Sequence, residues 1–397
     1  MRRALFLGLA LVVACQREKA PAPVAGAATR VDEDERGSLT GIVRGATIAS
    51  RTGEALFETS AAEVIDGDPG TYWLNPPRDF PQSIVIALPA RARIDRVGLR
   101  TAASSYTANR VQFDASGDGT TWQALTTATA RETADAQWFD VAPIEAEFLR
   151  VTVIDPRPSQ TDVRLQSVLA RGAELEPPRP GPIEGCWTLN GRAARFAQRG
   201  AHVVGALAIG NLPLFLDGGS DGRVVRFVWI RGNDYGLALA SVSPDGKHLT
   251  AVEWHEEAIP LFRAESWFGE RCERRAEARP TLREDVALAL LQRVGRYSAF
   301  GLRFRDDDTL DIEASRETLK LLAQLLESHR ARIVVHEFRE ATPQANKVRA
   351  QRVLESVRAA LGSDVELVAV GSDAPRQQPV TEAQRAMYSS VDLEIRR

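Results

Sequence analysis

The chain of 397 residues has little cysteine and almost no net charge: it contains three cysteines and has a formal net charge of −3. With so few thiols we expect no metal site built from cysteine alone. Lysines and arginines do not cluster on any expected element, so we expect no nucleic-acid partner. Beyond residue 15 no apolar run approaches the roughly 18–20 residues of a membrane-spanning helix, so any membrane contact has to come from a lipid.

The sequence also lacks the metalloprotease motif His-Glu-x-x-His. His255 is followed by Glu256 and Glu257, which would suit a metal or acid–base chemistry. Neighbouring residues on a strand point to opposite faces, however, so His255 and Glu256 would not converge on one ion. We therefore predict that the chain is not an enzyme.

The N-terminal segment has the parts of an export signal: a basic start at residues 1–3, a short apolar run, and Leu-Val-Val-Ala-Cys at residues 11–15. This run resembles the bacterial lipobox. The resemblance implies cleavage before Cys15 and acylation of that cysteine, which would anchor the chain by lipid. Gln16 replaces the aspartate that favours inner-membrane retention, so we expect an outer-membrane lipoprotein facing the periplasm or the cell surface.

Once Cys15 is assigned to the lipid, Cys186 and Cys272 remain. Disulfides persist in exported proteins, so we predict that these two cysteines pair. They bracket a block of short strands separated by glycine and aspartate turns, which predicts an antiparallel β meander or a small barrel.

Residues 46–172 alternate short β-branched runs with turn residues, a pattern that predicts an antiparallel β-sandwich. Val-Ile-Asp-Gly-Asp-Pro-Gly-Thr-Tyr-Trp at 64–73 and Ser-Gly-Asp-Gly-Thr-Thr-Trp at 116–122 resemble the discoidin family, also called coagulation factor 5/8 C-terminal type. The resemblance implies a jelly roll that binds glycans, lipids or proteins through loops at one end. Asn75 and Tyr106 mark the candidate loops, and the family pattern places Trp73 and Trp122 in the core.

In that family the loop equivalent to residues 66–71 often holds calcium, which implies Asp66, Asp68 and Thr71 as ligands. Gln166 stands near the position of the closing acidic ligand and lacks its charge. A structural calcium ion and a metal-free Asp-Gly turn therefore both remain open. No other cofactor is required.

After residue 275 the pattern alternates helices and strands, which predicts two βα units, a closing hairpin and a compact α/β sandwich. The order resembles the OmpA C-terminal-like domain, a peptidoglycan-binding module. The resemblance places Arg352, six residues after Asn346, on the carboxylate of the wall peptide, with Glu340 replacing the family's aspartate. His-Glu-Phe-Arg-Glu at 336–340 departs from the family's Gly-His-x-Asp, so a scaffold that only docks protein is the alternative.

Together these patterns predict a non-enzymatic outer-membrane lipoprotein that links the membrane to peptidoglycan and binds a glycan or an envelope protein. The alternatives are an envelope glycan-acting enzyme with a carbohydrate-targeting module, and a protein-docking adhesin or assembly factor. The expected parts are a signal peptide (1–14), lipidated cysteine and flexible linker (15–45), discoidin-like β-sandwich (46–172), disulfide-closed β domain (183–275) and OmpA-like domain (281–397).

Overall fold

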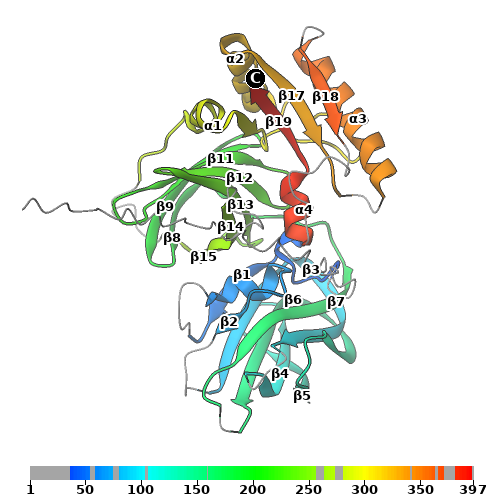
Figure 1. Cartoon of the computed structure of the whole chain (residues 1–397). Coiled ribbons are helices and arrows are strands. Elements are labelled where there is room, and N and C mark those ends of the chain that lie inside the picture. Colours follow the sequence, from blue (N-terminus) through cyan, green and yellow to red (C-terminus); the bar gives the residue numbers. More distant parts are fainter. Residues whose placement is uncertain are drawn as a thin grey trace, which may run out of the picture. The chain divides into compact units, whose positions relative to one another are not determined.

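Figure 1 shows the computed structural model of the chain. It describes residues 36–53, 59–74, 80–102, 106–158, 160–255, 263–272, 280–339, 342–362, 365–370 and 381–395. No helix within these ranges is long and apolar enough to cross a membrane.

The folded part begins earlier than the sequence pattern predicts. Ile42 is fully buried, and the Thr40 hydroxyl donates a 2.6 Å hydrogen bond to the Val168 carbonyl. The prediction of a flexible linker is therefore wrong for residues 36–45. Their hydroxyl side chains and few apolar residues attach them to the sandwich. Cys15 and the rest of the linker lie outside the described residues.

The first block is an antiparallel sandwich whose strands pair in the order β2-β7-β3-β6-β4-β5, with β1 on β3. Its core contains Trp73, Ile84, Ile86 and Phe113. Its elements are η1 (Ile42–Arg44), β1 (Thr47–Arg51), η3 (Ala61–Ile65), β2 (Trp73–Leu74), β3 (Gln82–Thr101), β4 (Ala108–Ser116), β5 (Gln123–Thr129), β6 (Gln137–Pro156) and β7 (Arg164–Glu174).

The sequence pattern predicts two separate strands at 83–87 and 94–100, whereas the structure has one continuous strand, β3. The pairing of β3 with β6 is interrupted between Ala87 and Ala92, and Pro89 lies in that gap. Proline has no amide hydrogen for the ladder, so it is tolerated where the pairing is broken. The strand continues through the proline and changes neighbours, from β1 to β7.

The second block is a closed barrel of the eight strands β8 to β15 (Figure 1). Large aromatic side chains fill its interior, among them Trp187, Trp229 and Trp267. The disulfide between Cys186 and Cys272 is present, with a Cα–Cα distance of 5.4 Å, and it confirms the predicted pair. The strands are β8 (Gly185–Leu189), β9 (Arg192–Arg199), β10 (His202–Leu207), β11 (Leu214–Ser220), β12 (Val225–Arg231), β13 (Asp234–Val242), β14 (His248–His255) and β15 (Arg263–Arg271).

The C-terminal block has a four-stranded sheet in the order β16-β19-β17-β18, and α2 and α3 pack against it. The elements are α1 (Val286–Val294), β16 (Arg296–Ser298), α2 (Arg316–Ser328), β17 (Ala331–His336), α3 (Pro343–Leu361), β18 (Leu367–Val370), α4 (Glu382–Tyr388) and β19 (Ser390–Ile395).

The predicted closing hairpin is wrong. β18 runs parallel to β17, while β19 enters antiparallel between β16 and β17, so β18 and β19 are not neighbours. The helix α4, which the sequence analysis did not predict, precedes β19. A capping box between Thr381 and Gln384 begins this helix, so the local signal for it was present in the sequence.

Candidate functional site

The loop at residues 66–71 closes on its own side chains. The Asp66 carboxylate accepts hydrogen bonds from the Asp68 amide and the Thr71 hydroxyl, both at 2.8 Å. The Asp68 carboxylate accepts the Gly70 amide at 2.8 Å. The three predicted metal ligands therefore lie together, and each carboxylate already has hydrogen-bond donors from the same loop.

Gln166 lies against this loop, where the resemblance places the closing ligand. Its amide nitrogen donates a 2.5 Å hydrogen bond to the Pro69 carbonyl, while its amide oxygen is buried without a hydrogen-bond partner in the described part of the chain. Oxygen donors of this kind suit a hard cation such as calcium. This loop has one negative charge fewer than the family's calcium site, because Gln166 is neutral where the family has an acidic ligand.

An arginine and two tyrosines meet beside this loop. The guanidinium carbon of Arg164 lies 4.2 Å from the ring centroid of Tyr106 and 4.8 Å from that of Tyr72. The pairing of β2 with β7 causes this arrangement, because it places Leu74 opposite Arg164 and brings Tyr72 to the same edge. The Arg164 amide also donates to the Tyr106 carbonyl at 2.9 Å. We call Tyr72, Tyr106 and Arg164 the tyrosine–arginine cluster.

Tyr106 was predicted from sequence as a ligand-loop residue, whereas Tyr72 and Arg164 were not. All three side chains are partly exposed. The signal that could have identified Arg164 is its place at the start of the last strand, next to the candidate loops. Asn75, the other predicted loop residue, lies outside the described residues.

The two tryptophans of the family pattern behave differently. Trp73 is fully buried, as predicted. Trp122 is only half-buried, and the Arg150 guanidinium carbon lies 4.3 Å from its ring centroid. Arg150 also contacts the Asp114 carboxylate at 3.0 Å, so its charge is paired. The prediction of a core position is therefore wrong for Trp122.

In the C-terminal block, the predicted wall-binding residues do not form one exposed site. Asn346 is only 2% exposed, in the first turn of α3. Arg352 is 56% exposed at its side chain and lies 3.2 Å from the Asp308 carboxylate. Glu340 lies outside the described residues. The structure therefore does not join Asn346 and Arg352 in one exposed site.

A second arginine on the same helix makes stronger contacts. Arg349 lies 2.8 Å from Asp308 and 3.4 Å from Glu337, two buried carboxylates. Burial raises the pKa of Glu337, but the positive charges of Arg339 and Arg349 outweigh it, so the net pKa is lowered. Arg349 was not predicted as a site residue, although it stands three residues before Arg352 and shares its helix face.

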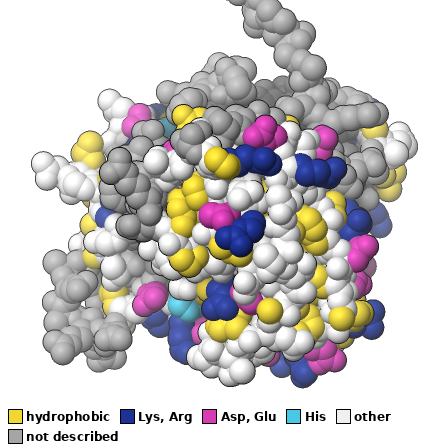
Figure 2. Space-filling model, turned by 90° about the horizontal axis from the view of Figure 1, so that it is seen from below, with side chains coloured by type: hydrophobic (Ala, Val, Ile, Leu, Met, Phe, Trp, Pro, Cys, Tyr) yellow, Lys and Arg dark blue, Asp and Glu magenta, His cyan; other side chains and the backbone are white. Residues whose placement is uncertain are grey.

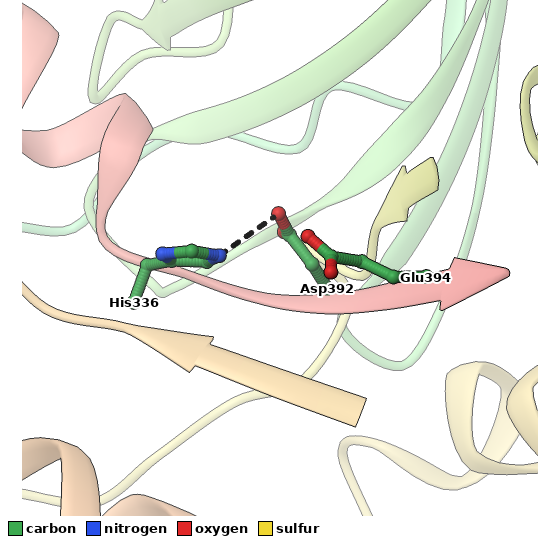
Figure 3. Close-up of side chains that lie close together, drawn as sticks. All are labelled: His336, Asp392 and Glu394. Atoms are coloured by element: carbon green, nitrogen blue, oxygen red, sulfur yellow. Dashed lines mark ion pairs between the residues drawn. The ribbon is translucent and has the colours of Figure 1, made fainter. Parts of the chain in front are cut away.

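His336, Asp392 and Glu394 project from β17 and β19 toward one another, with ligand atoms within 4.8 Å (Figure 3). His336 Nε2 lies 3.7 Å from Asp392 Oδ2. Two guanidinium groups reach the same carboxylates: Arg332 lies 3.2 Å from Glu394, and Arg296 lies 4.0 Å from Asp392. These cations would compete with a metal, so we treat the group as a charge cluster.

A further polar cluster joins the barrel to β16. The buried Asp217 carboxylate accepts a 2.6 Å hydrogen bond from the Tyr297 hydroxyl and lies 3.2 Å from His202 Nε2. Burial lowers the pKa of His202, but the hydrogen bond and charge of Asp217 outweigh it, so the net pKa is raised. Burial raises the pKa of Tyr297, and Asp217 raises it further.

Residues 218–222 read Gly-Gly-Ser-Asp-Gly, a formal match to the nucleophile motif Gly-x-Ser-x-Gly. Ser220 lies at the end of β11, where successive side chains alternate between faces, so Ser220 and Asp217 point to opposite sides. The Ser220 hydroxyl accepts the Gly222 amide at 3.2 Å and closes a turn. The motif therefore forms part of an antiparallel connection and not a strand-to-helix nucleophile elbow.

His255 packs edge-on against Trp229, with ring centroids 5.0 Å apart. Glu256 and Glu257 lie outside the described residues.

On the face in Figure 2, acidic and basic side chains are interspersed with apolar ones.

Residues 47–164 match the family model for the F5/8 type C domain. Similar solved structures include the C-terminal domain of a chitobiase from Bacteroides fragilis. The two sequences are 24% identical, the match covers 33% of this chain and 96% of that chain, and the TM-score is 0.31. Another is the family 32 carbohydrate-binding module of Clostridium perfringens NanJ in complex with galactose. Here the sequences are 18% identical, the match covers 32% of this chain and 98% of that chain, and the TM-score is 0.28. No curated protein matches the chain. The block that contains the tyrosine–arginine cluster is therefore an F5/8 type C domain.

Proposed function

We propose that the chain is a glycan-binding protein that holds its ligand at the tyrosine–arginine cluster of the F5/8 type C domain. The observation that carries this proposal is the position of Tyr72, Tyr106 and Arg164 beside the loops that the family resemblance associates with ligands. Tyrosine rings offer flat faces for sugar rings and hydroxyls for hydrogen bonds, and arginine adds several donors. The proposed role is non-enzymatic.

The same resemblance also allows a lipid or a protein as ligand. A lipid-inserting loop needs large exposed apolar side chains. The exposed large apolar residues in the described ranges are Leu175, Leu212, Ile312 and Val348, and none of them lies beside the tyrosine–arginine cluster. A partly exposed cluster of two tyrosines and an arginine suits a polar, ring-shaped ligand better than an acyl chain.

Affinity electrophoresis of the intact protein tests the proposal, in native gels that contain galactan, chitin or polygalacturonate. We expect retardation in at least one gel and its loss in Tyr106→Ala. Tyr235→Ala is a matched control, because Tyr235 lies near the Arg293 guanidinium, with 6.0 Å between guanidinium carbon and ring centroid, but on the barrel. Equal retardation of wild type and Tyr106→Ala in every gel would contradict the site.

We also propose that lipid on Cys15 anchors the glycan-binding part to the outer membrane. The run at residues 11–15 supports this proposal. Incorporation of radiolabelled palmitate by wild type, and its absence in Cys15→Ser, is the expected outcome in a Gram-negative host. Label in both chains would remove the proposed attachment point.

Linkage to the cell wall by the C-terminal block is a second candidate function. The exposed part of Arg352 favours it, since a guanidinium fork can take a wall-peptide carboxylate. Co-sedimentation of the intact protein with purified sacculi, compared with Arg352→Ala, tests this candidate. Equal sedimentation of the two proteins would exclude the predicted contact.

A further inference from the structure

We propose that the glycan site selects sugars that carry a carboxylate, and that the Arg164 guanidinium is the group that recognises it. The inference rests on the proposed glycan-binding function and adds the substrate class. It follows from the charge of Arg164, which pairs with no acidic side chain among the described residues, and from the contacts of its guanidinium with two tyrosine rings.

Arg164 differs from other arginines of the same domain. Arg110 contacts Asp155 at 2.6 Å, and Arg150 contacts Asp114 at 3.0 Å. Among the described residues, the Arg164 side chain makes no hydrogen bond or ion pair, and its Nε atom is buried without a partner. Its contacts are with the faces of two tyrosine rings.

The guanidinium carbon lies over both tyrosine rings, and these ring contacts use none of the hydrogen-bond donors of the group. The two rings also restrict the motion of the side chain, so less freedom is lost when a ligand binds. A partly desolvated cation with unused donors favours an anionic acceptor over a neutral hydroxyl.

The planar fork of arginine matches a carboxylate, which accepts two parallel hydrogen bonds. On a glycan such a carboxylate is present, for example, in a uronate or in the lactyl ether of muramic acid. Both present a carboxylate next to a sugar ring, so the carboxylate can meet Arg164 while the ring lies against Tyr72 or Tyr106.

Isothermal titration of the intact protein with two matched pairs of probes tests the inference. The first pair is trigalacturonic acid and its methyl ester, and the second is the disaccharide of N-acetylglucosamine and N-acetylmuramic acid with chitobiose as its neutral counterpart. We expect wild type to bind the acidic member of at least one pair about tenfold or more tightly than the neutral one, as for a charge-assisted contact. The pair that shows the difference identifies the source of the carboxylate.

Arg164→Gln should lose about tenfold or more of its affinity for the acidic probe and a smaller part of its affinity for the neutral one, so that the preference disappears. Arg231→Gln is the control for the change in net charge, because Arg231 lies on the barrel, 5.9 Å from the Trp229 ring centroid. Equal binding of acidic and neutral probes by wild type overturns the acid selectivity and leaves the glycan-binding function intact. An acid preference that survives in Arg164→Gln overturns the role of Arg164, whereas absence of binding to any probe contradicts the proposed function itself.

Discussion

The Arg164 guanidinium carbon lies 4.2 Å from the centroid of the Tyr106 ring, and the Arg164 amide donates to the carbonyl of the same tyrosine. One backbone hydrogen bond and one cation–π contact thus hold the two residues together. This double contact fixes a cation at the loop end of the F5/8 type C domain.

We expect Gln166→Glu to make the domain respond to calcium more strongly than wild type. The substitution adds the negative charge that the oxygen donors around Asp66 lack. Thermal unfolding in calcium and in chelator measures the effect, with Gln198→Glu on β9 as a control for the added charge. Equal calcium shifts in wild type and Gln166→Glu would contradict the assignment of Gln166 to the closing position.

Loss of the barrel disulfide should lower the free energy of unfolding by about 2–5 kcal/mol. The double variant Cys186→Ser, Cys272→Ser removes the bond that joins the two ends of the barrel, 86 residues apart. Urea unfolding of the barrel, followed by tryptophan fluorescence, measures the change. An unchanged midpoint would show that the closed strands suffice without the link.

Stability should fall as the pH rises above about 6.5, because His202 then loses its proton in the unfolded chain first. Its pKa is raised in the folded protein by Asp217, so protonated His202 stabilises the fold below its unfolded pKa of about 6.5. This contribution is lost as the pH rises through the folded pKa. Chemical unfolding of wild type and His202→Gln between pH 5.5 and about 8.5 gives the free energy of unfolding at each pH. We expect it to fall with pH in wild type only, and parallel curves for the two proteins would contradict the pairing of His202 with Asp217.

Arg349→Ala should destabilise the protein more than Arg352→Ala. Arg349 lies between the buried carboxylates of Asp308 and Glu337, so its loss should cost about 1–3 kcal/mol. Arg352 is largely exposed and, within the described ranges, its one ion pair is with Asp308, so we expect its loss to cost under about 1 kcal/mol. Urea unfolding of both variants gives the comparison, and a larger effect of Arg352→Ala would reverse the assigned roles.

The sequence predicts the strand blocks and the Cys186–Cys272 pair well, because alternation and turn residues are local signals. The two strands predicted at 83–87 and 94–100 are one strand, because Pro89 lies where the ladder is interrupted and the pairing on either side is set by distant strands. Trp122 was misplaced for a related reason: its exposure depends on Arg150 of a neighbouring strand.

The candidate site could be predicted only in part. Tyr106 belongs to a loop that the family resemblance marks, but its meeting with Arg164 and Tyr72 requires the β2–β7 pairing. No spacing in the sequence predicts a contact of Tyr72 or Tyr106 with Arg164, because these residues are far apart along the chain. Arg349 illustrates the opposite case, because its helical spacing from Arg352 was available and was not used.

The most direct test of the glycan-binding site is the NMR spectrum of the intact protein with ¹³C-labelled tyrosine. The chain has five tyrosines, so each signal can be assigned by a Tyr→Phe substitution. On titration with trigalacturonic acid or its methyl ester, we expect the signals of Tyr72 and Tyr106 to move and those of Tyr235, Tyr297 and Tyr388 to stay. Shifts confined to the last three tyrosines would place binding elsewhere and contradict the proposed site.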